Sequence, residues 1–284
     1  MTSKRTPENV TIRPRNLHFH LDSADNPHWL NGDPVATAVL NTLSLTFPDG
    51  ERLFMDAVRA HSTQVNGKLA QDVKDFIAQE AIHSREHHML NQLIDRNKYP
   101  VEKIEARVRE NIALSRDSGP KRMLMATICL EHFTAMLADM MVTHDDLFSK
   151  TDPEIERLWR WHAMEETEHK AVAYDVFLDA TKDWSGLKRY VRRSLAMLII
   201  SRQFTNNITE YAAWMLEAEG YEPRDARKRV KRFLWKEPGF FRRGGSIWAS
   251  WFKPGFHPWD HDNRALMDEW RSEFDLSTGY SPSS

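Results

Sequence analysis

Long segments with almost no proline or glycine dominate the sequence, and within each segment apolar residues recur every three or four positions. That spacing is the period of one face of an α-helix. The sequence also lacks the strand patterns expected of a Rossmann or barrel fold, so it predicts an all-α protein. The expected helices cover residues 50–65, 68–97, 102–116, 120–147, 153–182 and 186–218.

The order of these segments predicts the domain organisation. Four long helices joined by short loops favour an antiparallel four-helix bundle, so we expect residues 48–236 to form a helical domain with additional helices. Residues 1–47 are interrupted by prolines and predict an irregular N-terminal arm. Residues 237–284 are rich in Gly, Pro and aromatic side chains. We expect them to form an irregular C-terminal extension that packs on the bundle.

Composition excludes several classes of protein. The formal net charge is −2, so overall electrostatics gives no reason to expect nucleic-acid binding. Cys129 is the only cysteine, which excludes a disulfide framework or a cysteine-held metal cluster within one chain. The N-terminus lacks the apolar run of a secretory signal, and the longest apolar run, "LAMLII", is too short to span a bilayer. We therefore expect a cytoplasmic protein.

The segment "HAMEETEH", residues 162–169, concentrates metal-binding side chains on one helix. With about 100° of rotation per residue, Glu166 lies about 40° and His169 about −20° from His162. The three residues therefore share one narrow stripe and form a candidate set of ligands. Glu165 lies about 60° away and is an alternative ligand. Glu168 points away from the stripe, and we expect it to be solvated.

Three other predicted helices carry further candidates. Glu80 and His83 have the Glu-x-x-His spacing that di-metal bundle proteins use, and His87, one turn on, is a rival ligand. Glu131 lies in the apolar stretch "LMATICLEHFTAMLADMM", where an unpaired carboxylate would be costly to bury. Glu51 stands near the expected start of its helix. Taken alone, each residue fits an ordinary surface or structural role, but four successive helices supply the complete set.

These residues resemble a known ligand pattern. Glu51, Glu80-x-x-His83, Glu131 and Glu166-x-x-His169 are similar to the ligands of the ferritin-like di-iron carboxylate superfamily. His162 is similar to the additional histidine of the p-aminobenzoate N-oxygenase group. The resemblance implies a ferritin-like antiparallel bundle with two iron ions. It departs from the superfamily at Gln79, where many members have aspartate.

Over residues 14–270 the chain also resembles a bacterial family described as predicted metal-dependent hydrolases. The stretches that carry this resemblance are "FPDGERLF", "EAIHSREH", "EETEHKAVAYDVF" and "KPGFHPWD". The family description is itself an inference, so the reaction has to be argued from the ligands.

Four carboxylates with histidines suit iron, with manganese or zinc as alternatives. The expected function is activation of dioxygen to oxidise a small organic substrate, with electrons from an external donor. The alternative is a metal-dependent hydrolase that uses the same two-metal site, because paired metals can also activate water. A third interpretation is a non-catalytic metal-binding or oxygen-binding protein.

Two segments outside the predicted bundle need an interpretation. Residues 224–236 place apolar side chains along one side of a basic helix. We expect that side to pack on the bundle, and a peripheral membrane contact is the less favoured alternative. The stretch "FHPWDHD" predicts a structural clasp, since its proline breaks any helix. The sequence leaves a homodimer open.

Overall fold

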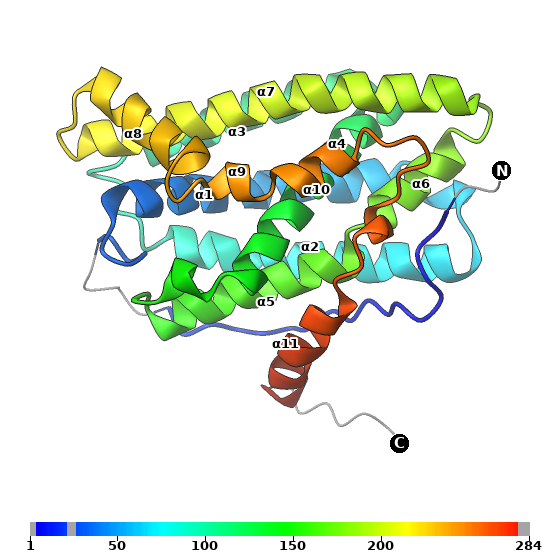
Figure 1. The fold of residues 1–284 in the computed structure, drawn as a ribbon, viewed down its shortest axis with the longest axis horizontal. Coiled ribbons are helices and arrows are strands. Elements are labelled where there is room, and N and C mark those ends of the chain that lie inside the picture. Colours follow the sequence, from blue (N-terminus) through cyan, green and yellow to red (C-terminus); the bar gives the residue numbers. More distant parts are fainter. Residues whose placement is uncertain (1–3, 22–26, 278–284) are drawn as a thin grey trace.

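The computed structural model describes residues 4–21 and 27–277, and this part of the chain is all-α, as the sequence predicts (Figure 1). The first six helices are α1 (Pro34–Arg59), α2 (Gly67–Asn91), α3 (Val101–Asp117), α4 (Pro120–Thr143), α5 (Pro153–His169) and α6 (Val172–Ala180). The remaining helices are α7 (Gly186–Ala218), α8 (Pro223–Trp235), α9 (Phe240–Arg243), α10 (Gly245–Ser250) and α11 (Arg264–Ser277). Three short 3₁₀ turns lie at Ser62–Gln64, Asp145–Phe148 and Pro258–Asp260.

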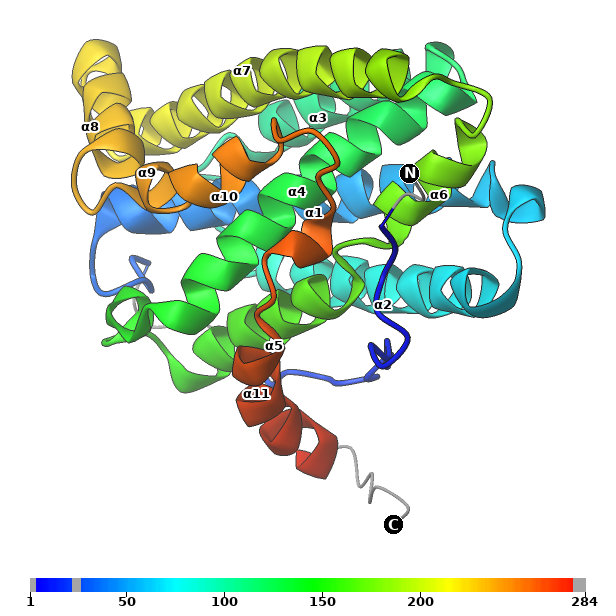
Figure 2. The same ribbon diagram turned by 45° about the vertical axis from the view of Figure 1, so that its right-hand side comes forward.

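Four of these helices enclose the site. α1 packs on α2, α2 on α5, α5 on α4 and α4 on α1, so the four form a closed ring around a common interior (Figures 1 and 2). α3 contacts α1 and α4 from outside, and α7 lies across the same two helices. α4 is long and apolar enough to cross a membrane by composition, yet 67% of its apolar window is buried within the protein, as a core helix requires.

Local sequence signals set the helix starts. The side chain of Asp33 accepts hydrogen bonds from the backbone N–H groups of Val35 and Ala36 at the start of α1, and Asp152 caps α5 in the same way. Proline occupies the first position of both helices and of α4, where its missing N–H costs nothing. The helix starts predicted at residues 120 and 153 are therefore confirmed.

The prediction of an irregular segment up to residue 47 is wrong for its last part, because α1 begins at Pro34 and continues through Pro48. A proline inside a helix leaves the carbonyl four residues earlier without its usual donor. Here the side-chain amide of Asn91, on α2, donates to the carbonyl of Ser44 at 3.0 Å. The neighbouring helix thus satisfies the carbonyl that the proline leaves free.

The helix predicted over residues 153–182 also differs, because it divides into α5 and α6 at Lys170 and Ala171. No proline or glycine marks this break in the sequence. Lys170 is buried there, and its ammonium group donates to the carbonyl of His261 and to the side chain of Asn263, each at 2.7 Å. The C-terminal segment therefore holds the chain at the junction.

Both terminal segments pack on the helices. Residues 10–20 run extended along α2 and α5, with alternate side chains buried. The C-terminal extension contains the short helices α9, α10 and α11, and it inserts the fully buried Trp251 beside Arg193 of α7. In the clasp stretch, the side chain of His257 contacts Asp175 of α6 at 3.2 Å. The apolar side of α8 is buried, as predicted, through Ala226, Val230, Phe233 and Leu234.

Candidate metal centre

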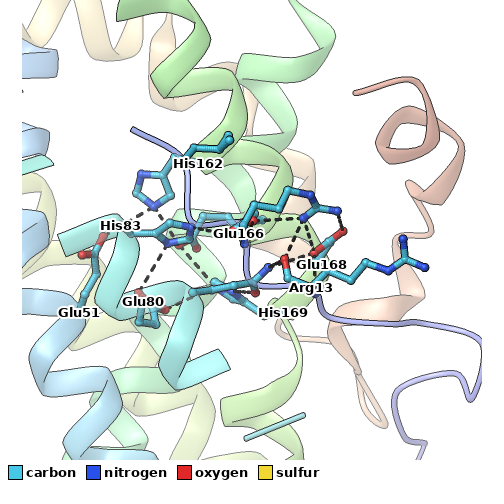
Figure 3. Close-up of polar contacts among 12 residues, drawn as sticks. Arg13, Glu51, Glu80, His83, His162, Glu166, Glu168 and His169 are labelled. Atoms are coloured by element: carbon cyan, nitrogen blue, oxygen red, sulfur yellow. Dashed lines mark hydrogen bonds and ion pairs between the residues drawn. The ribbon is translucent and has the colours of Figure 1, made fainter. Parts of the chain in front are cut away.

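The ring of helices brings all of the predicted ligands together in its interior, where each side chain is at most 5% exposed. α1 provides one residue, α2 two, α4 one and α5 three, and Figure 3 shows how six of these side chains converge. The seven residues are Glu51, Glu80, His83, Glu131, His162, Glu166 and His169.

Their donor atoms form two adjacent groups. Glu51, His83 and His162 make one group whose ligand atoms all lie within 4.8 Å of one another. The second group consists of Glu80, Glu131 and His169. A third set, made of Glu80, His83 and Glu166, overlaps the other two. The arrangement is therefore a double site with two carboxylates near its middle.

The hydrogen bonds around His162 determine which of its two ring nitrogens carries the proton. Asn91 donates its amide to the Ser44 carbonyl, so its side-chain oxygen accepts the Ser44 hydroxyl proton at 2.7 Å. The Ser44 oxygen then accepts from Nδ1 of His87 at 2.9 Å. The other nitrogen of neutral His87 accepts from Nδ1 of His162 at 2.6 Å. In neutral His162, Nε2 therefore carries a lone pair directed toward Glu166 at 3.0 Å, and the hydrogen bond between them requires one proton, on the Glu166 carboxyl or on Nε2.

The same reasoning applies to His169. The side-chain amide of Gln79 donates to the carbonyl of Arg13 and to Glu168, both of which can only accept. The Gln79 oxygen must then accept from Nδ1 of His169, at 2.9 Å. Nε2 of neutral His169 is left as a lone pair, 3.4 Å from Glu80 and 3.4 Å from Glu166. Gln79 thus orients the ring of His169.

His83 is oriented by a carboxylate. Its Nε2 lies 3.0 Å from Glu165, whose other oxygen accepts from the backbone and the guanidinium of Arg15 at 3.2 and 3.1 Å. Burial and the neighbouring Glu168 raise the pKa of Glu165 well above the usual carboxyl range, and Arg15 opposes that shift. We assign the ionised form because Arg15 donates two hydrogen bonds to it. Nδ1 of His83 then faces the interior, and burial lowers the pKa of this imidazole and keeps it neutral.

The inward carboxylates lack donors. Among the described residues, no hydrogen-bond partner reaches either oxygen of Glu80 or Glu131, or one oxygen each of Glu51 and Glu166. Burial raises the pKa of Glu51, Glu80 and Glu131 well above the usual carboxyl range. For Glu166, burial also raises the pKa, but His169 and His162 lower it overall. Unpaired buried carboxylates are costly, so the interior has a deficit of positive charge.

A second layer of buried charges lies behind α5. The expectation that Glu168 is solvated is wrong, and Glu165, the alternative ligand, contacts His83 from outside the inward groups. Their side chains are fully buried and pair with Arg15, which is itself 3% exposed. Arg271 of α11 also reaches Glu168 at 2.8 Å. Helix period does not separate these buried carboxylates from solvated ones, because their partners Arg15 and Arg271 lie far away in the sequence.

His87 is buried but lies outside the inward groups, and its Nε2 contacts Nδ1 of His162. Burial lowers its pKa and keeps it neutral. Glu51 also differs from its expected position, because it lies deep within α1 rather than in the first turn. Ser84 of α2 donates to one of its oxygens at 2.7 Å.

A cavity of ≈ 130 Å³ reaches the site from the side of α1, α3, α4 and α7. Glu51 and Glu166 form part of its wall, next to Phe47 and Leu130. Most of the remaining wall is apolar, and Asn111, Gln203 and Tyr211 contribute a small polar cluster. The cavity can therefore admit a small, mainly apolar molecule to the inward carboxylates.

Comparison with known proteins identifies the family. A family model described as "Predicted metal-dependent hydrolase" matches residues 13–262, and the chain belongs to this family. No curated protein and no solved structure matches the chain significantly. The similarity to ferritin-like di-iron proteins accordingly stays a prediction that rests on the ligand pattern.

Proposed function

We propose that the seven inward residues hold two divalent metal ions and that the protein is a metal-dependent hydrolase of small substrates with an apolar group. One observation carries this proposal. Three imidazole lone pairs and four carboxylates face one another, and the described residues around them supply no proton donor to several of these atoms. Cations are the partners that such a set of atoms requires.

The distances fit shared ions. The histidine nitrogens lie 3.4–3.9 Å from the oxygens of Glu51, Glu80 and Glu131. Ligand atoms about 2.0–2.2 Å from a common ion are separated by similar distances. In this assignment Glu51, His83 and His162 would hold one ion, Glu131 and His169 would hold the other, and Glu80 and Glu166 would complete the ligand set.

The charges also balance, because four carboxylates offset two divalent ions. When bound, a metal pair polarises a carbonyl or phosphoryl oxygen and lowers the pKa of a bound water. The protein's own contribution is orientation: Glu165, Gln79 and His87 each hold the outer nitrogen of one ligand histidine. The apolar cavity wall would position the substrate group and exclude bulk water.

A second candidate function is activation of dioxygen by a di-iron site. The donor set favours it, because four glutamates on helices can shift between bridging and terminal binding and so accommodate redox change. Dioxygen and an external electron donor would then be the co-substrates. The family description agrees better with hydrolysis, and we therefore place the oxidase second.

The test separates the two functions with one preparation. Chelator-treated protein is reloaded with zinc, manganese or ferrous iron, and bound metal is counted by mass spectrometry. Each form is then assayed for hydrolysis of p-nitrophenyl esters of increasing chain length and for oxygen uptake. We expect the parent protein to bind two ions per chain and to show metal-dependent hydrolysis. The Glu166→Gln variant should lose both of these properties.

The control is Glu156→Gln, on the same helix, where the carboxylate is partly exposed and bonds only to Arg160 among the described residues. This variant should keep both ions and full activity. One ion or none in the parent protein would contradict the metal assignment. Oxygen uptake by the ferrous form without any hydrolysis would favour the oxidase.

A further inference from the structure

The outer face of α7 exposes an unusual run of aliphatic side chains. Of the eight large hydrophobic residues that are exposed in the described part of the chain, five lie on this helix, at 42–73% exposure. They are Leu187, Val191, Leu195, Leu198 and Ile199. Their spacing of mostly three or four residues places them along one side of the helix. A contiguous exposed apolar surface of this kind marks an interaction site.

The charges on the same face have one sign. Residues 184–209 contain five lysine or arginine residues and no aspartate or glutamate. Lys188, Arg192 and Arg202 are exposed, and within the described part of the chain none of the three forms an ion pair with a carboxylate. The face is therefore both apolar and cationic.

We propose that this face of α7 docks on an anionic lipid membrane. An amphipathic helix that lies in the plane of the bilayer surface buries its aliphatic side chains at the boundary of the headgroups, while its lysines and arginines bind lipid phosphates. Both features of the face are used in this arrangement. In Figures 1 and 2, α7 lies along one side of the molecule, outside the ring of α1, α2, α4 and α5.

Charge complementarity argues against a second copy of the chain as the occupant. In a two-fold dimer the same patch contacts itself, so the cations of one α7 would lie against those of the other, and residues 184–209 of neither helix supply an acidic side chain. An anionic membrane has no such conflict. Each lysine or arginine near its surface contributes about 1 kcal/mol.

The position of the face has a consequence for the cavity. The same helix contributes Ile200, Phe204 and Ile208 to the cavity wall, and Gln203 both lines the cavity and is exposed. The cavity therefore approaches the surface beside the proposed docking face. An apolar molecule could pass from the bilayer into the protein by a short path. The docking proposal goes beyond the hydrolase proposal and does not depend on it.

Co-sedimentation of the full-length, metal-free protein with vesicles tests the proposal. Vesicles of phosphatidylcholine alone are compared with equimolar phosphatidylcholine and phosphatidylglycerol, at low and at high salt. We expect binding to the mixed vesicles at low salt, and about tenfold weaker binding without anionic lipid or in high salt. Absence of binding by the parent protein to the mixed vesicles would overturn the proposal.

A matched pair of double variants locates the contact. Leu195→Gln with Leu198→Gln removes two side chains that are 54% and 50% exposed on α7. The control, Met89→Gln with Leu114→Gln, removes two that are 52% and 69% exposed on α2 and α3. The α7 variant should bind at least about tenfold more weakly, and the control should match the parent.

Sedimentation velocity on the same proteins tests the rival occupant. Equal vesicle binding by the two double variants would refute docking through α7. A parent dimer that the α7 variant dissociates would identify a second copy as the occupant, and would also refute it. Because all four substituted side chains are exposed, both variants should keep the parent's unfolding temperature. The metal and activity assays are unaffected by either outcome.

Discussion

Replacing Glu131 by glutamine should change stability in opposite directions in the metal-free and metal-bound protein. Glu131 is 2% exposed and neither of its oxygens has a partner among the described residues. In the metal-free protein this buried carboxyl group must either stay ionised without a hydrogen-bond partner or take up a proton, so a neutral amide should be better tolerated. With metal bound, the same oxygen atoms would coordinate the ion, so the substitution removes a ligand.

The magnitudes follow from the two environments. An uncompensated buried charge costs about 3–5 kcal/mol, whereas an unpaired buried amide costs about 1–3 kcal/mol. Glu131→Gln should therefore stabilise the metal-free protein by about 2 kcal/mol, or by several degrees in unfolding temperature. A ligand at about one hundred times its dissociation constant stabilises by about 2.7 kcal/mol, and the variant should lose most of that gain.

The pH dependence provides a check on the cause. Burial raises the pKa of Glu131 in the folded protein. A carboxyl with a raised folded pKa favours folding below its unfolded pKa, and this advantage disappears as the pH rises through the folded value. The benefit of Glu131→Gln to the metal-free protein should therefore be largest at about pH 8 and should shrink toward about pH 5.

The assay is thermal and urea unfolding of parent and variant, each with and without metal. Glu168→Gln is the control, because Glu168 is equally buried but pairs with Arg15 and Arg271. Breaking that pairing should destabilise both forms by about 3–5 kcal/mol, with no change of sign. If Glu131→Gln also destabilised the metal-free protein at pH 8, the inference of an uncompensated carboxylate would be wrong.

The remaining predictions concern the histidines and the protons. His83→Ala should lower the number of metal ions per chain. His87→Ala should keep two ions but bind them about 10–100-fold more weakly, because it frees the ring of His162. Mass spectrometry after dialysis against graded concentrations of chelator distinguishes the two variants, and the reverse result would place His87 among the ligands. His162→Ala should keep the fold and at least one ion. Under the second candidate function, its ferrous form should also react more slowly with oxygen than the parent, as stopped-flow mixing would show; equal rates would mean that His162 only packs. Metal binding should release protons and weaken as the pH falls from about 8 to about 6, because three of the four inward carboxyls have raised pKa values. Calorimetry in buffers of different ionisation enthalpy measures the number of protons released. If no protons are released, these carboxyls are already ionised before metal binds.

The inward residues could be predicted from the sequence because helix period alone decides which side chains share a stripe. The spacing of His162, Glu166 and His169 determines their common face wherever the helix lies in the protein. Glu80 and His83 follow the same rule on α2. Each helix therefore carries its part of the pattern locally, and the bundle only has to turn the faces toward one another.

The partners of the histidines could not be predicted in this way. Arg15 contacts Glu165 and Glu168 across 150 and 153 positions of sequence, and no local pattern in the N-terminal arm indicates that it will be buried. The early start of α1 has a similar cause, since the donor that compensates for Pro48 comes from Asn91 on another helix. Sequence periodicity indicates which side chains share a face of a helix. It does not indicate the single side chains, far away in the sequence, that form hydrogen bonds or ion pairs with that face.

The contacts around the site connect these unpredicted features to its chemistry. Asn91 compensates for the proline in α1 and, through Ser44 and His87, also sets the tautomer of His162. Gln79 likewise sets the tautomer of His169 while it binds the backbone of the N-terminal arm. The outer nitrogen of each ligand histidine is thus fixed by groups that also join separate elements of the fold. Because folding forms these bonds, the inward lone pairs are directed before any metal binds, and the ligand atoms need little rearrangement when it does.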